Sequence, residues 1–173
     1  MAAAALLSGC AGLVPRRQAA APVGLGPESR QDPALSGNGR LLASVVERGG
    51  RSTVLLQDRR SGQVLPLRHL RGQQPHSSPA LSWNGRYLAL LVQRGPHRQA
   101  VVEDRLTGQF YPLLLPPGRE PQRLSLAADG RQVAIDLLDN GQRRVEVFDL
   151  STLLEADLAP GQRESGGGPG MVP

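Results

Sequence analysis

The sequence is short of the residues on which many binding and catalytic sites depend. It has a single cysteine, Cys10, so no internal disulfide can form. It has no lysine, and all 20 of its basic residues are arginines. Aromatic residues make up only 3% of the chain, so a core must be built from Leu, Val and Ala. No apolar run reaches the roughly 20 residues that a membrane-spanning helix needs.

Motifs for catalysis and for metal binding are also missing. The three histidines, His69, His76 and His97, follow no metal-ligand spacing, and there is no second thiol to support a zinc site. We expect all three to be solvated surface residues. No Gly-x-Ser-x-Gly motif marks a hydrolase nucleophile, and the glycines at 166–170 follow no strand and open no helix, as a phosphate-binding loop would. The sequence therefore indicates a non-enzymatic protein without a cofactor or metal.

A block that occurs three times is the most informative feature that is present. It reads PALSGNGR at 33–40, PALSWNGR at 79–86 and LSLAADGR at 124–131. The final arginines are 86 − 40 = 46 and 131 − 86 = 45 positions apart, and an aspartate follows each by 18 positions, at Asp58, Asp104 and Asp149. Such a period indicates an array of structural units.

Each unit has the pattern of short strands joined by tight turns. The dipeptides Asn38-Gly39, Asn84-Gly85 and Asp129-Gly130 are typical of hairpin turns. An apolar run of strand length follows each dipeptide, and a second run ends at the repeated aspartate, which suits an Asx-type turn. In the first two units a Gly-Gln pair, at 62–63 and 108–109, leads into a further apolar stretch. About four antiparallel strands per unit are expected, as in one blade of a β-propeller.

This pattern resembles the TolB-type β-propeller repeat. The resemblance rests on Pro-x-Leu-Ser-x-(Asn/Asp)-Gly-Arg, on Leu-Ala within the next strand, and on a strand that ends in Asp before Ser-Gly or Thr-Gly. It covers residues 32–150 and implies an all-β fold of three propeller-type blades, a partial β-propeller. The family usually has Ser-Pro-Asp-Gly at the turn, whereas Gly37, Trp83 and Ala128 replace the proline here. The resemblance also implies a binding role in the cell envelope.

The third unit departs from the other two after Asp149. Residues 150–158 (LSTLLEADL) contain no Gly-Gln turn and no clear fourth strand. Ser151 or Thr152 would suit the N-cap of a short helix, with Glu155 in its first turn. We therefore expect a short helix in place of the fourth strand.

Three blades cannot close a ring, because propellers have about four to eight. Two arrangements remain open. Two chains join as a homodimer that completes a six-bladed ring, or a single three-sheet domain is capped by its flanking segments. An uncapped arc would expose apolar faces and strand edges to water, and both favour association.

The N-terminus resembles the lipobox of bacterial lipoproteins. Leu7-Ser8-Gly9 precedes Cys10, which the resemblance implies is lipidated and becomes the first mature residue. Several acyl chains on one residue would hold the protein stably at a membrane. The expected organisation is a lipoprotein signal segment at 1–9, a Pro/Ala/Gly-rich tether at 10–31, the repeat domain at 32–159 and a disordered Gly/Pro tail at 160–173.

The net charge of +5 raises the question of nucleic-acid binding. Arginines lie mostly in turns and alternate with acids, and no basic stripe carries stacking aromatics, which argues against it. Trp83 is the one irregular turn residue. It either contacts a partner or folds back over its own blade.

The sequence thus predicts a TolB-like lipoprotein, anchored by Cys10 to a bacterial membrane and facing the periplasm. Its expected role is a protein-interaction or assembly module with envelope proteins as partners. A propeller that senses a small ligand or glycan is the alternative. Binding of nucleic acid or an anionic surface through the arginines ranks third.

Overall fold

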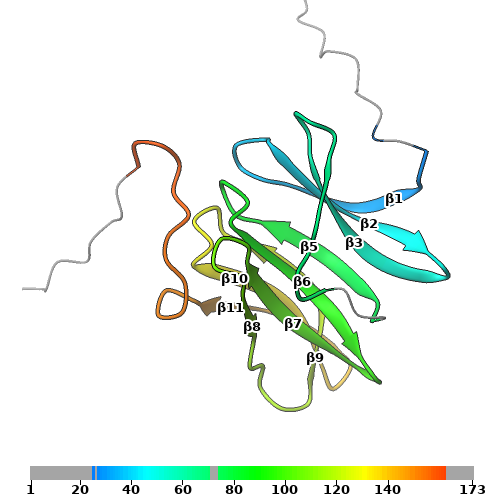
Figure 1. The fold of residues 1–173 in the computed structure, drawn as a ribbon. Coiled ribbons are helices and arrows are strands. Elements are labelled where there is room, and N and C mark those ends of the chain that lie inside the picture. Colours follow the sequence, from blue (N-terminus) through cyan, green and yellow to red (C-terminus); the bar gives the residue numbers. More distant parts are fainter. Residues whose placement is uncertain (1–24, 26, 71–73, 163–173) are drawn as a thin grey trace, which may run out of the picture.

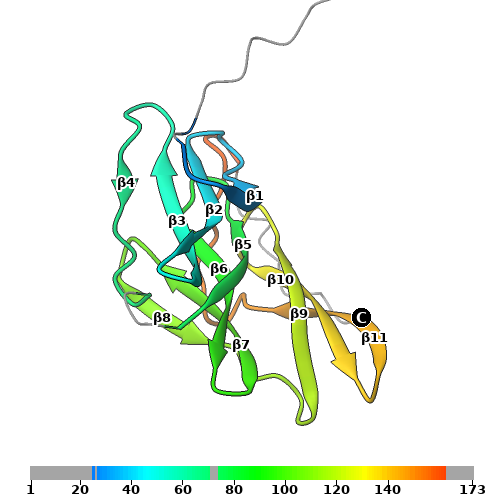
Figure 2. The same ribbon diagram turned by 90° about the vertical axis from the view of Figure 1, so that its right-hand side faces the viewer.

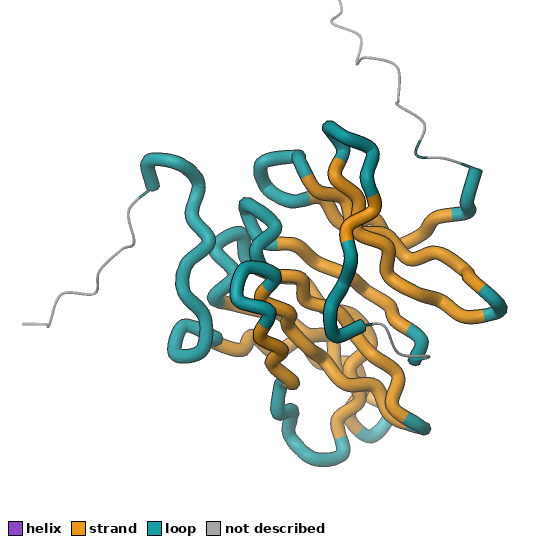
Figure 3. Tube along the Cα trace, in the orientation of Figure 1, coloured by secondary structure: helices purple, strands orange, loops and turns teal. Residues whose placement is uncertain are grey.

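The computed structural model describes residues 25, 27–70 and 74–162 of the chain. These residues form eleven β-strands and no helix (Figures 1 and 3). Cys10, most of the expected tether and residues 163–173 lie outside the described part. The first strand begins at Arg30, inside the segment expected to be the tether.

The strands form three antiparallel sheets in chain order, which we call blades 1, 2 and 3. Blade 1 comprises β1 (Arg30–Leu35), β2 (Leu41–Arg48), β3 (Arg51–Asp58) and β4 (Val64–Leu65). Blade 2 comprises β5 (His76–Leu81), β6 (Tyr87–Arg94), β7 (His97–Asp104) and β8 (Gln109–Pro112). Blade 3 comprises β9 (Arg119–Leu126), β10 (Gln132–Asp139) and β11 (Gln142–Asp149). The predicted all-β fold of three propeller-type blades is confirmed.

Blade 2 lies between the other two and is buried on both faces (Figures 1 and 2). Successive side chains of a strand point to opposite faces. The side chains of β6 are buried on both faces of blade 2. Leu88, Leu90 and Val92 pack against blade 1, while Ala89 and Leu91 pack against blade 3. This explains why β6 is a continuous apolar run in the sequence rather than an alternating one.

The turn between the first two strands of each blade has a geometry that glycine makes possible. In blade 1 the Gly39 amide donates to the Ser36 carbonyl at 2.8 Å, and Gly39 has a φ of 70°. Gly85 and Gly130 take the same left-handed conformation at φ 70° and 79°. Five residues separate the two strands in each blade (36–40, 82–86 and 127–131). Hairpin loops of this length are commonly built around a single tight turn.

The same glycines let neighbouring blades approach closely. A Cβ atom on Gly85 would lie 2.5 Å from Cδ1 of Leu41 in blade 1, and one on Gly130 would lie 2.3 Å from Cδ2 of Tyr87 in blade 2. Leu41 and Tyr87 both directly follow the repeated arginine. In each case, therefore, the first residue of one blade's second strand packs over the turn glycine of the next blade.

Blade 3 has three strands because its chain does not turn back after β11. In blades 1 and 2, Gly62 and Gly108 adopt φ of 72° and 75° four residues after the aspartate and start the fourth strand. Leu153 occupies this position in the third unit, and a leucine is strained in the left-handed region. The expected helix is absent too. Residues 151–153 form a single turn, in which the amides of Leu153 and Leu154 donate to the Leu150 carbonyl.

A substitution at Gly130 tests the packing of blades over turn glycines. We expect Gly130→Ala to lower the free energy of unfolding by about 2–4 kcal/mol, because it adds a clash with Tyr87 to the cost of positive φ. Gly141→Ala is the matched control, since Gly141 has φ of 82° with no atom within 4 Å of the added Cβ. It should cost only about 1 kcal/mol. Urea unfolding measures both, and equal losses would contradict the packing argument.

Candidate interaction surfaces

The three repeated turns lie next to one another at one end of the blades. The Asn38 amide donates to the Trp83 carbonyl at 2.9 Å, and the Trp83 amide donates to the Ala128 carbonyl at 2.6 Å. The Asn38 side chain also donates to Oδ1 of Asn84 at 3.3 Å. Backbone hydrogen bonds thus join the blades in a row at the positions of the repeated motif.

Each of the first two units carries an ion pair between its repeated arginine and aspartate. Arg40 and Asp58 are 2.9 Å apart, as are Arg86 and Asp104. The 18-residue spacing brings them together because the first residue of each second strand pairs with the aspartate, Leu41 with Asp58 and Tyr87 with Asp104. No such ion pair forms between Arg131 and Asp149 in the described structure.

Hydrogen bonds to these aspartates lower their pKa. The pKa of Asp58 lies below its ordinary value because the Arg60 amide and the Arg40 side chain bond to the ionised carboxylate. Burial alone would raise the pKa of Asp104, but bonds from Arg86 and from two amides of the following turn outweigh it, and the pKa is lowered. The pKa of Asp149 is lowered chiefly by the Ser151 amide. The stability that these carboxylates contribute is therefore present near neutrality and is lost as acid protonates them.

The indole ring of Trp83 packs over the turn of blade 1. A Cβ atom on Gly37 would lie 2.3 Å from Cε3 of the indole ring. The side chain is half-buried, and its indole nitrogen is buried without a hydrogen-bond partner in the described structure. Gly37, which occupies the same repeat position in blade 1, therefore leaves room for the ring of Trp83. A role for Trp83 in partner contact stays a prediction.

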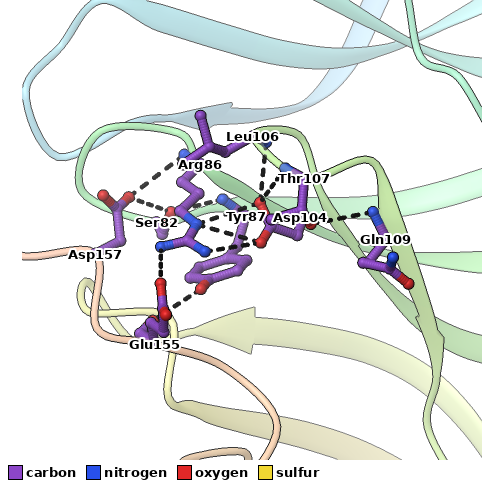
Figure 4. A network of polar contacts seen from close by, with 9 residues as sticks. All are labelled: Ser82, Arg86, Tyr87, Asp104, Leu106, Thr107, Gln109, Glu155 and Asp157. Carbon is purple, nitrogen blue, oxygen red and sulfur yellow. Dashed lines mark hydrogen bonds and ion pairs between the residues drawn. The ribbon is translucent and has the colours of Figure 1, made fainter.

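Residues 150–158, which we call the C-terminal strap, follow β11 and reach the turn of blade 2. Figure 4 shows Glu155 and Asp157 of the strap beside Ser82, Arg86 and Tyr87. Asp157 is 6% exposed and lies against this turn. Its Oδ2 accepts from the Ser82 hydroxyl at 2.5 Å and from the Asn84 amide at 2.8 Å, and its Oδ1 accepts from the Asn84 side chain at 2.9 Å. The Asp157 amide in turn donates to the Asp129 carbonyl of blade 3. Asp157 therefore fastens blade 2 to blade 3.

The strap makes further contacts with the first residues of β6. Arg86 pairs with Glu155 at 2.9 Å, and the Tyr87 hydroxyl donates to the Glu155 carbonyl at 2.8 Å. Burial raises the pKa of Tyr87 to about 12. The pKa of Arg86 is raised chiefly by its bond to Asp104. Leu150 and Leu154 anchor the strap in the core between blades 2 and 3.

The histidines do not share one environment. His69 and His97 lie on the surface as expected, His69 with Nε2 2.6 Å from the Gly108 carbonyl and His97 3.5 Å from Glu120. The expectation was wrong for His76, which is 2% exposed at the start of β5. Its Nδ1 faces Thr53 and the Val54 amide on β3, at 3.4 Å from each, and burial lowers its pKa.

The outward face of blade 3, on the side away from blade 2, is partly apolar and open. Val145 and Val147 on β11 are 71% and 65% exposed. Ala134 and Asp136 lie on the same face because they pair with Val147 and Val145. Asp136 bonds to Arg143 at 3.2 Å. We call this surface the blade 3 face.

The outward face of blade 1 is covered instead. Leu42, Val46 and Leu55 are all buried there, at 9% exposure or less. Arg30 donates to the Ser44 hydroxyl on this face at 3.2 Å and to the Leu25 carbonyl at 2.8 Å. The two ends of the array therefore differ in their exposure to solvent.

Residues 25, 27–70 and 74–162 hold no group of three or more His, Cys, Asp or Glu side chains placed to bind a metal ion. Within the same residues there is no helix with the length and apolar character to cross a membrane.

Comparison with solved structures supports the fold. The chain is similar to TolB from Acinetobacter baumannii, at 20% identity and a TM-score of 0.56, over 72% of this chain and 31% of that one. A putative TolB from Agrobacterium tumefaciens matches at 17% identity and a TM-score of 0.57, over 72% and 46%. The β-propeller domain of the Trilobed protease from Pyrococcus furiosus, described as having an open velcro topology, matches at 16% and 0.55, over 76% and 42%. Neither a protein-family model nor a curated protein matches the sequence.

These likenesses establish a TolB-like β-propeller fold for the chain. The chain spans less than half of the length of each of these structures. The fold is shared with proteins of different kinds, so activity and partners have to be argued from the surfaces of this chain.

Two acids of the strap offer a matched test of its role. We expect Asp157→Ala to lower the free energy of unfolding by about 2–3 kcal/mol, because it leaves the Ser82 hydroxyl and the Asn84 amide without their acceptor. Glu155→Ala should cost no more than about 0.5 kcal/mol, since the Glu155 side chain is 80% exposed. Urea unfolding measures the free energy of unfolding of both variants. Equal losses would show that Asp157 does not hold the strap in place.

Proposed function

We propose that this chain is a non-enzymatic protein-interaction module of the bacterial cell envelope, held at a membrane through Cys10, and that a partner protein binds the blade 3 face. One observation carries the proposal. The residues two and four positions before the repeated aspartate are buried between blades in units 1 and 2 but are exposed in unit 3.

Val54 and Leu56 in unit 1 are 6% and 0% exposed, and Ala100 and Val102 in unit 2 are both 0% exposed. The equivalent residues of unit 3 are Val145 and Val147, which remain apolar although they face solvent. Burying two valines is worth about 3–5 kcal/mol on transfer from water, which is enough to contribute substantially to an interface.

The rest of the blade 3 face is more polar than the surfaces between blades. Gln132 stands where Leu41 and Tyr87 stand in the other units, and Asp136 stands where Val45 and Leu91 stand. A mixed surface of this kind suits a partner that binds and dissociates, because exchangeable interfaces are about as apolar as ordinary protein surface. It suits a permanently packed fourth blade less well.

A homodimer that completes a six-bladed ring is the competing arrangement. Such a ring needs the blade 3 face of one chain to pack on the outward face of blade 1 of its partner. Leu42, Val46 and Leu55 are already buried on that face. A different protein is therefore the partner that we propose, and a stable six-bladed dimer is the competing outcome of the test below.

Affinity capture from solubilised envelope, with the full chain as bait, tests the proposed surface. We expect Val145→Asp to lose at least one protein that the unaltered chain retains, because the substitution buries a charge in the interface. Leu106→Asp is the control, since Leu106 is also apolar and 74% exposed but lies on a blade 2 turn. If both variants retain the same proteins, the blade 3 face is not the binding surface. Light scattering that finds a Val145-dependent dimer would favour the ring.

The proposed membrane anchor rests on the resemblance of residues 7–10 to a lipobox. We expect the full chain, expressed in a bacterium, to incorporate labelled palmitate and to sediment with membranes, and Cys10→Ser to lose both properties. The arginines nearest the cysteine, Arg16 and Arg17, would then lie close to anionic headgroups. Unchanged labelling and sedimentation of the Cys10→Ser chain would contradict the anchor.

A further inference from the structure

The outer edge of β11 has no neighbouring strand in the described structure. In blade 1, β3 pairs with β4, and in blade 2, β7 pairs with β8, but the sheet order of blade 3 ends at β11. An exposed edge offers unpaired backbone N–H and C=O groups to any extended segment that reaches it.

The repeat shows which backbone groups point outward at this edge. In blade 2 the Leu113 amide donates to the Ala100 carbonyl, and the Gly108 amide donates to the Asp104 carbonyl. Every second residue of a strand points its backbone groups to the same side, so Val102 does so too. The equivalent residues of β11 are Val145, Val147 and Asp149. Their N–H and C=O groups therefore face the open edge.

An apolar cleft lies beside the same edge. It has a volume of about 430 Å³ and lies where β8 of blade 2 approaches the end of β11, and Tyr111, Leu113, Leu114, Phe148 and Leu153 are among the residues that line it. Leu114 and Leu153 are 92% and 54% exposed. An apolar cleft next to a free strand edge is the combination that strand-addition sites use, with backbone bonds for affinity and a pocket for specificity.

The interface between blades 1 and 2 shows which side chain of a fourth strand would lie at the position of the cleft. Phe110, on the fourth strand of blade 2, pairs with Glu103 of β7 and packs into the core between blades 1 and 2. The position equivalent to Glu103 on β11 is Phe148. A strand added to β11 would place one side chain opposite Phe148, directed toward blade 2 and into the cleft.

Among the described residues, none supplies this strand. Residues 154–157 are the ones that correspond by the repeat to β8 at 109–112. They are held elsewhere, with Leu154 in the core and Asp157 on the turn of blade 2. Because Leu153 replaces the turn glycine and Asp157 fastens the strap, residues 150–158 leave the edge without a partner strand.

We propose that the free edge of β11 binds an extended segment of a partner protein as a fourth, antiparallel strand of blade 3, with an aromatic or large apolar side chain in the cleft opposite Phe148. The occupant resembles β8, because β8 is the strand that fills this place in blade 2. The inference rests on the proposed function and deepens it by naming the form that one partner takes. It uses backbone groups and the cleft, whereas the blade 3 face uses the side chains of Val145 and Val147.

A peptide with the sequence of residues 108–114 (GQFYPLL), which contains β8, is the probe. Fluorescence anisotropy would measure its binding to the full chain, and hydrogen exchange would follow the amides of Val145 and Val147. We expect saturable binding and slower exchange of these two amides. Replacing the phenylalanine of the peptide by serine should weaken binding by about tenfold or more, because the cleft loses its apolar occupant.

Two variants of Val147 distinguish the loss of an edge hydrogen bond from the loss of folding. Val147→Pro removes an outward N–H but no bond of the ladder to β10, and proline is tolerated on edge strands. Val147→Thr keeps both the N–H and the branched shape. We expect the proline variant to lose at least about tenfold in affinity, with the threonine variant near the unaltered chain. Equal circular dichroism and unfolding midpoints would show that both remain folded.

Three results would overturn the proposal. The first is equal binding of the peptide to the proline and threonine variants, and the second is the absence of saturable binding by a folded chain. The third concerns hydrogen exchange of the Val145 and Val147 amides in the free chain. If both amides are protected, and if this protection is lost when residues 163–173 or 1–24 are removed, the chain itself occupies the edge. None of these depends on the capture experiment. Peptide binding that survives Val145→Asp would uphold the edge even if the blade 3 face proved not to bind a partner.

Discussion

The structure depends on the close approach of each blade to the turn glycine of the next. Leu41 packs over Gly85 and Tyr87 over Gly130, at distances that leave no room for a Cβ atom. Only a residue without a side chain, at a φ that other residues rarely adopt, allows this contact. The two core clusters, on either side of blade 2, form as a consequence.

A second glycine position decides whether a blade has four strands. Gly62 and Gly108 turn the chain back along the outer edge of their blades. Leu153 in the third unit does not, and the residues that follow become a strap that joins blade 3 to the turn of blade 2 through Asp157. The strap stabilises the end of the array, because it adds Leu154 to the core and gives Asp157 three close donors. It also leaves the edge of β11 without a neighbouring strand in the part of the chain that the structure describes. The stability of the last blade and its open edge thus have one cause.

The sequence predicted the periodic parts of the fold and missed the contacts that the period does not contain. The Asn-Gly and Asp-Gly turns lie where the pattern placed them, because local backbone preferences determine them. His76 was misjudged because its burial comes from β3 of the neighbouring blade. The packing of Trp83 over Gly37 was visible in the sequence only as two unusual residues in the same repeat position. The strap was interpreted as a helix from its capping residues, since nothing in nine residues shows that Asp157 bonds to a turn more than 70 positions earlier.

The two ends of the array differ in a way that bears on how it meets other proteins. Blade 1 buries Leu42, Val46 and Leu55 on its outward face, whereas blade 3 exposes Val145 and Val147 beside Gln132 and Asp136. Terminal units of repeat proteins need a polar outer face to remain in solution, and the glutamine and aspartate meet part of that need. The two valines do not. They are exposed next to the edge of β11, and the partner that we propose for the blade 3 face would remove them from water.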